Sequence, residues 1–121
     1  MTQEEKLILS RMTYTNLIQT LKTTLESIED SRTYMYKEQM VEIGLEGAET
    51  LPEGLYKFYI EGRKIILENR LIGQEFELTQ HIVARNIIKF LKAIDVYYIF
   101  FPGPQIVIKV EDLEELLKEW S

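Results

Sequence analysis

Apolar positions in the first thirty residues recur at helical spacing. One narrow arc, at 100° per residue, contains Leu7, Tyr14, Ile18, Leu21, Leu25 and Ile28. Thr2 followed by Glu5 fits a capping box, so the pattern predicts a long amphipathic helix from residue 3 to about residue 30. Such a helix would be about 42 Å long, whereas a compact domain of this size is about 35 Å across. Either the helix breaks near Thr13 or it extends beyond the domain.

An extended helix would expose its apolar stripe. Seven-residue spacing is how a chain offers a helix to a second copy of itself, so the stripe is a candidate protein interface. The candidate residues on this helix are Leu7, Tyr14, Leu21 and Ile28. The other interpretation is that the helix packs on the sheet of its own chain.

Residues 31–44 have the pattern of a second, shorter helix that ends at Gly44. Residues 45–54 have the Gly, Pro and Glu content of a connecting loop. The expected organisation is one domain of 121 residues, with a helical N-terminal segment (1–44) followed by sheet and helices (55–121).

From Leu55 onward the apolar period changes to two, as in strands. The runs LYKFYI and RKIILE predict a hairpin around a Glu61-Gly62 turn, with Tyr56 opposite Leu67. Residues 71–78 are predicted to form a third strand. Its expected inward residues are Ile72, Phe76 and Leu78.

The C-terminal part predicts a helix over residues 79–94 with Thr79 as its N-cap, a hairpin over residues 97–109, and a final helix. The final helix should present to the core Leu113, Leu116, Leu117 and Trp120. The element order is α-α-β-β-β-α-β-β-α, which indicates an α+β fold with a mainly antiparallel sheet.

The hairpin over residues 97–109 is apolar on both faces. A loop at Pro102-Gly103-Pro104 pairs Phe100 with Ile106. The face predicted to be core then contains Val96, Tyr98, Phe100, Ile106, Ile108 and Val110. The opposite face contains Tyr97, Ile99, Phe101 and Val107, with Gln105 and Lys109 as its polar members.

Leaving the four apolar side chains of that second face in water would forfeit roughly 6 to 12 kcal/mol. This is comparable to the net stability of a domain, so something must cover them. The cover is either the N-terminal helix of the same chain or another polypeptide. Tyr97, Ile99 and Phe101 are therefore candidate interface residues.

Composition narrows the classes of function. The formal charge is −6, from 14 basic and 20 acidic residues, which argues against a general binder of phosphate backbones. There is no Cys, so disulfides and thiolate sites are excluded. No segment approaches the length of an apolar membrane span and the N-terminus is polar, so we expect no membrane partner and a cytoplasmic location. Seventeen Glu against three Asp, together with 15 Ile, is typical of thermophiles.

Basic residues share one face of the predicted helix 79–94. Arg85, Lys89 and Lys92 lie within about 80° of His81 on a helical projection. Together with Arg63 and Lys64 on the preceding hairpin, they form a candidate anion or nucleic-acid surface. The alternative is an ordinary solvated helix face.

No nucleotide-binding or metalloprotease motif occurs, and His81 is the only histidine, without a partner at a spacing that catalysis would need. We therefore expect no cofactor or metal site and lean against an enzyme. The sequence favours a non-enzymatic assembly or adaptor protein that self-associates or docks in a larger complex. The alternative is a small nucleic-acid-binding factor that uses the basic face of helix 79–94.

Overall fold

The computed structural model describes residues 1–78 and 83–120, and side chains up to residue 118. The helices are α1 (Gln3–Ser10), α2 (Tyr14–Glu26), α3 (Lys37–Glu42), α4 (Val83–Ala93) and α5 (Val110–Trp120), with 3-10 turns at Asp30–Arg32 and Ala48–Thr50. The strands are β1 (Tyr34–Tyr36), β2 (Leu55–Glu61), β3 (Lys64–Asn69), β4 (Gln74–Leu78), β5 (Tyr98–Phe101) and β6 (Ile106–Lys109). The predicted α+β fold with antiparallel pairing is confirmed.

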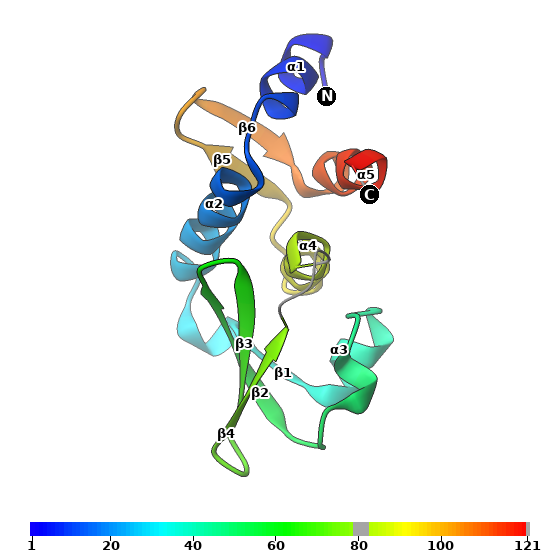
Figure 1. Cartoon of the computed structure of the whole chain (residues 1–121). Helices are drawn as coiled ribbons and strands as arrows, with labels where there is room; N and C mark the ends of the chain where they lie inside the picture. The colour runs from blue at the N-terminus through cyan, green and yellow to red at the C-terminus, as the bar shows by residue number, and fades with distance from the viewer. Residues whose placement is uncertain (79–82, 121) are drawn as a thin grey trace.

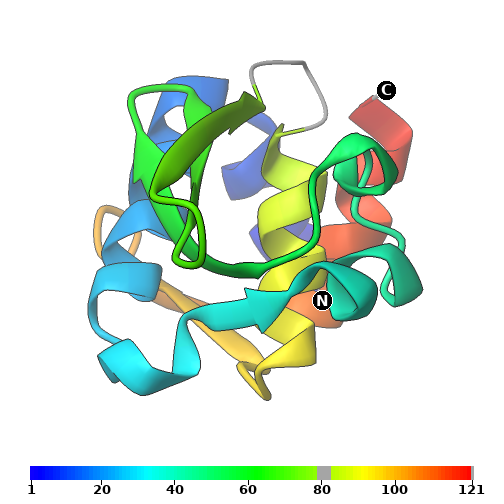
Figure 2. The same ribbon diagram turned by 90° about the horizontal axis from the view of Figure 1, so that it is seen from below.

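Helix α4 lies in the middle of the molecule (Figure 1). On one side of it is the four-stranded sheet β1-β2-β3-β4, and on the other is the two-stranded ribbon β5-β6. Helix α2 packs against both α4 and β5, and α5 packs against α4 and β6. Seen from below, α3 and α5 lie on one side of α4 and α2 lies on the other (Figure 2). The ribbon is therefore held by helices, separately from the main sheet.

The N-terminal helix breaks at Thr13, which is one of the two predicted alternatives. Thr2 and Glu5 form the expected capping box at the start of α1. The Thr13 hydroxyl then accepts a hydrogen bond from the Asn16 N–H at 3.1 Å and starts α2 as a separate helix. Because the chain turns here, the part of the apolar stripe that lies on α2 packs in the core of its own chain, whereas Leu7 on α1 is exposed.

The predicted helix over residues 31–44 was too long. Only Lys37–Glu42 is α-helical, and Tyr34–Tyr36 instead forms β1, which pairs antiparallel with β2. The sequence Tyr-Met-Tyr alternates like a strand, with Met35 buried and Tyr36 exposed. Gly44 ends α3 with φ +77°, as predicted.

The first hairpin turns one residue later than predicted, at Gly62-Arg63. Gly62 adopts φ +61°, and Glu61 pairs with Lys64. Tyr56 therefore lies opposite Asn69 rather than Leu67. Because the shift is two residues along the partner strand, each side chain keeps its predicted face.

The prediction that Ile72 points inward was wrong. Ile72 is exposed in the turn between β3 and β4, where the Asn69 Oδ1 atom accepts hydrogen bonds from the Leu71 and Ile72 N–H groups. Asn69 itself is fully buried. Phe76, after the turn, packs against the core as expected.

The core is centred on α4. The ring of Phe90 stacks on the ring of Phe58 from β2, with their centroids 3.9 Å apart. The predicted apolar face of α5 is buried at Leu113, Leu116 and Leu117. The predicted cap Thr79, His81 and the side chain of Trp120 lie outside the described residues.

Candidate protein interface

The direction in which β5 leaves α4 is set by a left-handed residue at the end of the helix. Asp95 adopts φ +65°, and the Val96 N–H donates to the Leu91 carbonyl at 2.9 Å. The Asp95 N–H donates to the Lys92 carbonyl at 3.1 Å. This is the hydrogen-bond pattern of a Schellman motif, which ends a helix and turns the chain sharply.

The two faces of β5 are the reverse of the prediction. Gln105 adopts φ +55° and belongs to the loop, so the loop has four residues and Phe101 pairs with Ile106. The predicted three-residue loop paired Phe100 with Ile106. A shift of one residue exchanges the faces of one strand relative to the other.

The inner face of the ribbon belongs to the core of the chain. Ile99 and Phe101 are 0% exposed, and Ile108 on β6 is buried beside them. Helix α2 packs against β5, so the N-terminal helix does cover this face. Ile99 and Phe101, which the sequence named as candidate interface residues, therefore lie inside the chain, in agreement with the alternative in which the N-terminal helix of the same chain covers them.

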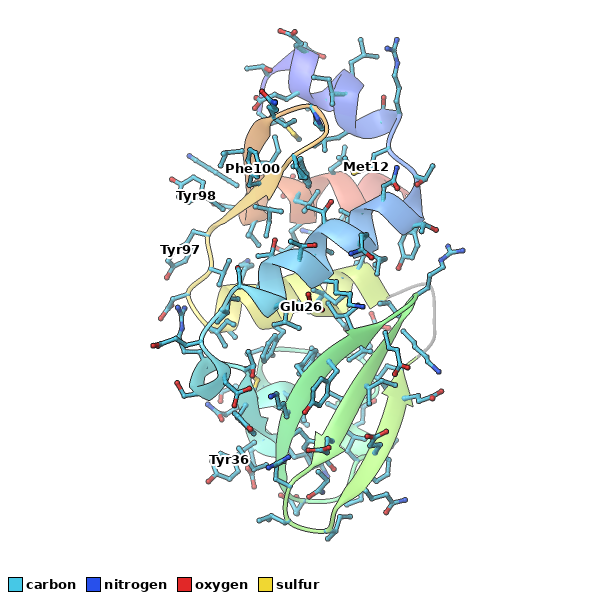
Figure 3. All side chains as sticks on the ribbon, turned by 90° about the vertical axis from the view of Figure 1, so that its left-hand side faces the viewer. Met12, Glu26, Tyr36, Tyr97, Tyr98 and Phe100 are labelled. Atoms are coloured by element: carbon cyan, nitrogen blue, oxygen red, sulfur yellow. The ribbon has the colours of Figure 1, made fainter. Side chains whose placement is uncertain are left out.

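The outer face of the ribbon is apolar and exposed. Tyr98 is 59% exposed, and the neighbouring pair Phe100 and Val107 are 55% and 54% exposed. Tyr97, just before β5, is 59% exposed. These four residues are called the ribbon patch below. In Figure 3 its labelled members follow one another along the side of the ribbon away from α2.

A hollow of about 400 Å³ lies at the base of the ribbon patch. It is lined by Lys92, Tyr97, Tyr98, Lys109, Val110 and Glu111. The Tyr97 hydroxyl donates to the Asp95 carboxylate at 2.8 Å, and this hydrogen bond raises the pKa of Tyr97. The bond holds one aromatic wall of the hollow in place.

The charges around the hollow are of both signs. Lys92 makes an ion pair with Glu114 at 3.0 Å. The exposed side chains of Lys109 and Glu111 have neither a hydrogen bond nor an ion pair within the described residues. Within the described residues, the exposed rings of Tyr97 and Tyr98 are therefore bordered by one cation, Lys109, and one anion, Glu111, whose side chains make no such contact.

The predicted interface residues on the N-terminal helices are mostly covered by their own chain. Leu21 is fully buried and Ile28 packs against the core. The Tyr14 hydroxyl accepts a hydrogen bond from the Ala84 N–H at 3.1 Å, and the Arg63 guanidinium lies 5.0 Å from its ring centre. Leu7, on α1, is exposed.

Three of the five residues of the predicted basic surface form ion pairs within the chain. Lys64 pairs with Glu77 and Arg85 pairs with Glu46, both at 2.9 Å, in addition to the pair at Lys92. Lys89 donates to the Gly44 carbonyl at 2.8 Å. The three ion pairs reduce the positive charge that is free to meet phosphates, and nucleic-acid binding stays a prediction.

A second hollow of about 300 Å³ lies between α2 and β2. Asp30 at its edge accepts hydrogen bonds from Lys57 and from the Tyr34 hydroxyl. The Lys57 hydrogen bond is the main cause of a lowered pKa for Asp30, and the same bond raises the pKa of Lys57. The charges here satisfy one another within the chain.

Within residues 1–78 and 83–120 no three His, Cys, Asp or Glu side chains are grouped so that they could hold a metal ion. None of the helices described is both long and apolar enough to cross a membrane. No family model matches the sequence, and no significant match is found among curated proteins or solved structures.

Proposed function

We propose that this chain is a non-enzymatic assembly or adaptor protein that binds another protein chain through the ribbon patch. The observation that carries the proposal is that Tyr98, Phe100 and Val107 lie on the outer face of the ribbon with Tyr97 next to them in the chain, and that each of the four is more than half exposed. They comprise three aromatic rings and one valine, and aromatic residues are enriched where protein surfaces meet.

The size of the patch supports an interface. Its side chains leave roughly 400 Å² of apolar surface in water, within the range of the largest patches on soluble monomers, which are often functional. Fully burying a side chain of this kind is worth about 1.5 to 3 kcal/mol. A partner that covers the patch would recover a large part of this free energy.

The position of the patch supports the same function. Strands β5 and β6 pair only with each other in the described part of the chain, so each has an edge without a neighbouring strand. Strand β5 reads Tyr-Ile-Phe-Phe and has no charged residue to discourage pairing. The ribbon therefore offers apolar side chains and unpaired strand edges in one place.

Site-specific photocrosslinking tests the proposal. A photoreactive residue at position 98, in the patch, is compared with one at position 71, since Leu71 is an exposed apolar residue in the turn between β3 and β4. In extract of the native cell we expect an adduct from position 98, with a second copy or with another chain, that disappears when Phe100→Glu is added. Equal yields from the two positions would contradict the proposal.

A further inference from the structure

We infer that the partner of the ribbon patch is a second copy of this chain, which binds face to face across a two-fold axis. This inference rests on the proposed function and adds the identity of the occupant. Three properties of the patch support this inference: a projecting ring next to a hollow, the signs of the charges at the rim of the hollow, and the area of the patch.

The first property is that a projection and a hollow lie on the same face. Phe100 projects from β5, and the hollow of about 400 Å³ opens beside Tyr98, two residues earlier on the same strand. The two features are about 7 Å apart at the rise of an extended strand. A cavity of about 150 Å³ is enough for a benzene-sized ring. The hollow therefore has room for a phenyl ring.

A surface that contains both features can complement itself. If a two-fold axis passes between Tyr98 and Phe100, the Phe100 ring of each copy lies over the hollow of the other. Each ring then inserts between the Tyr98 ring and the stem of Lys109 of the opposite copy. Such reciprocal contacts are what a two-fold interface requires, because residue i meets j and j meets i.

The second property is the sign of the charges at the rim. The chain has a net charge of −6, so two copies repel each other over most of their surfaces. At the ribbon, Lys109 and Glu111 contribute one charge of each sign, and neither is paired within the described residues. A rim of mixed sign suits an identical partner, whereas a rim of one sign would select a partner of opposite charge.

The third property is the area. A stable interface buries about 800 Å² on each partner. The patch supplies roughly half of that as apolar surface. The exposed loop at Pro102, Gly103, Pro104 and Gln105, together with the rim of the hollow, adds polar and backbone area around it. An apolar centre surrounded by a polar rim is the usual anatomy of such interfaces.

The test is a measurement of molar mass by light scattering and sedimentation on the purified full chain from about 1 µM to 1 mM. We expect a reversible dimer. Phe100→Glu and Phe100→Lys should each raise the dissociation constant at least a hundredfold, and Leu71→Glu should leave it within threefold. Circular dichroism and thermal unfolding verify that each variant is folded.

An equimolar mixture of Phe100→Glu and Phe100→Lys makes the test specific for a second copy. The carboxylate introduced in one chain can reach the ammonium group introduced in the other across the two-fold axis. The mixture should therefore associate at least tenfold more tightly than either variant alone. A monomeric wild type at 1 mM, a dimer insensitive to both variants, or a mixture no tighter than its components would each overturn the inference. Adducts from position 98 with a different chain would then still support the proposed function.

Discussion

At the scale of single residues, Asn69 and Gly54 determine how the end of the main sheet closes. Asn69 is fully buried, donates from its Nδ2 to the Glu53 carbonyl at 3.2 Å, and accepts from the N–H groups of Leu71 and Ile72 in the turn after β3. Gly54 lies directly against it, and a Cβ atom at Gly54 would overlap the Asn69 side-chain amide. Gly54 is therefore required for close approach to a buried polar group.

We predict that Gly54→Ala lowers the free energy of unfolding by about 1–3 kcal/mol, the usual cost of overpacking. The added methyl group displaces Asn69 and its hydrogen bonds to the turn. Gly103→Ala is the matched control, because a Cβ atom there meets nothing within 4 Å. Urea denaturation of the two variants measures the difference. Equal stabilities would show that the Asn69 amide moves without cost.

At the scale of elements, the helix break at Thr13 turns one amphipathic segment into two. Helix α2 buries Leu17, Ile18, Leu21 and Leu25, whereas the only buried residue of α1 is Leu9. The Thr13 hydroxyl supplies the hydrogen bond that lets α2 begin at this point. The Thr13 cap therefore determines the residue at which α2, the helix that covers the inner face of the ribbon, begins.

We predict that Thr13→Ala destabilises the protein by about 1 kcal/mol through loss of the N-cap. Thr15→Ala, at an exposed position in the first turn of the same helix, should change stability by less than about 0.5 kcal/mol. Thermal unfolding followed by circular dichroism compares the two variants. If Thr15→Ala lowered the stability as much as Thr13→Ala, loss of the N-cap would not explain the effect at Thr13.

Most helices and strands could be predicted from local sequence patterns. The errors lie in segments whose conformation is determined by tertiary contacts. The break at Thr13 and the end of α3 at Gly44 have local signals that the sequence displays. The strand at Tyr34–Tyr36 is only three residues long and is stabilised by pairing with β2, which no local pattern reveals. A short segment of this kind follows its neighbours rather than its intrinsic propensity.

The exposed apolar side chains of the ribbon lie in the hairpin that the sequence singled out, but on the face of β5 that the sequence assigned to the core. Both faces of that strand are apolar, so alternation could not tell which one is buried. The outcome depended on whether Gln105 belongs to the loop or to β6, and glutamine is not a residue that marks φ > 0. A sequence with a glycine at this position would have indicated the longer loop.

At the scale of the whole molecule, stability is concentrated around α4. Seven of its eleven residues are buried, among them the Phe90 ring that stacks on the main sheet. Helix α1 lies at the opposite end from the main sheet, beyond the ribbon (Figure 1). Elements with few buried residues open locally more easily than those in the core.

Native-state hydrogen exchange should reflect this difference. We predict that amides in α4 exchange only through global unfolding, and that amides in α1 exchange at least about a hundredfold faster. Mass spectrometry of peptides that cover the two helices measures both rates. Equal protection would mean that α1 is part of the same cooperative unit as α4.

In the face-to-face pair that we infer, the position of Phe100 and the hollow on one face of the ribbon would also limit how far an assembly can grow. When two such faces meet, each ribbon patch is covered by the other, and neither chain has a second ribbon patch with which to bind a third copy. Growth therefore ends at a pair, whereas a projection and hollow on opposite sides of the molecule would allow open-ended filaments.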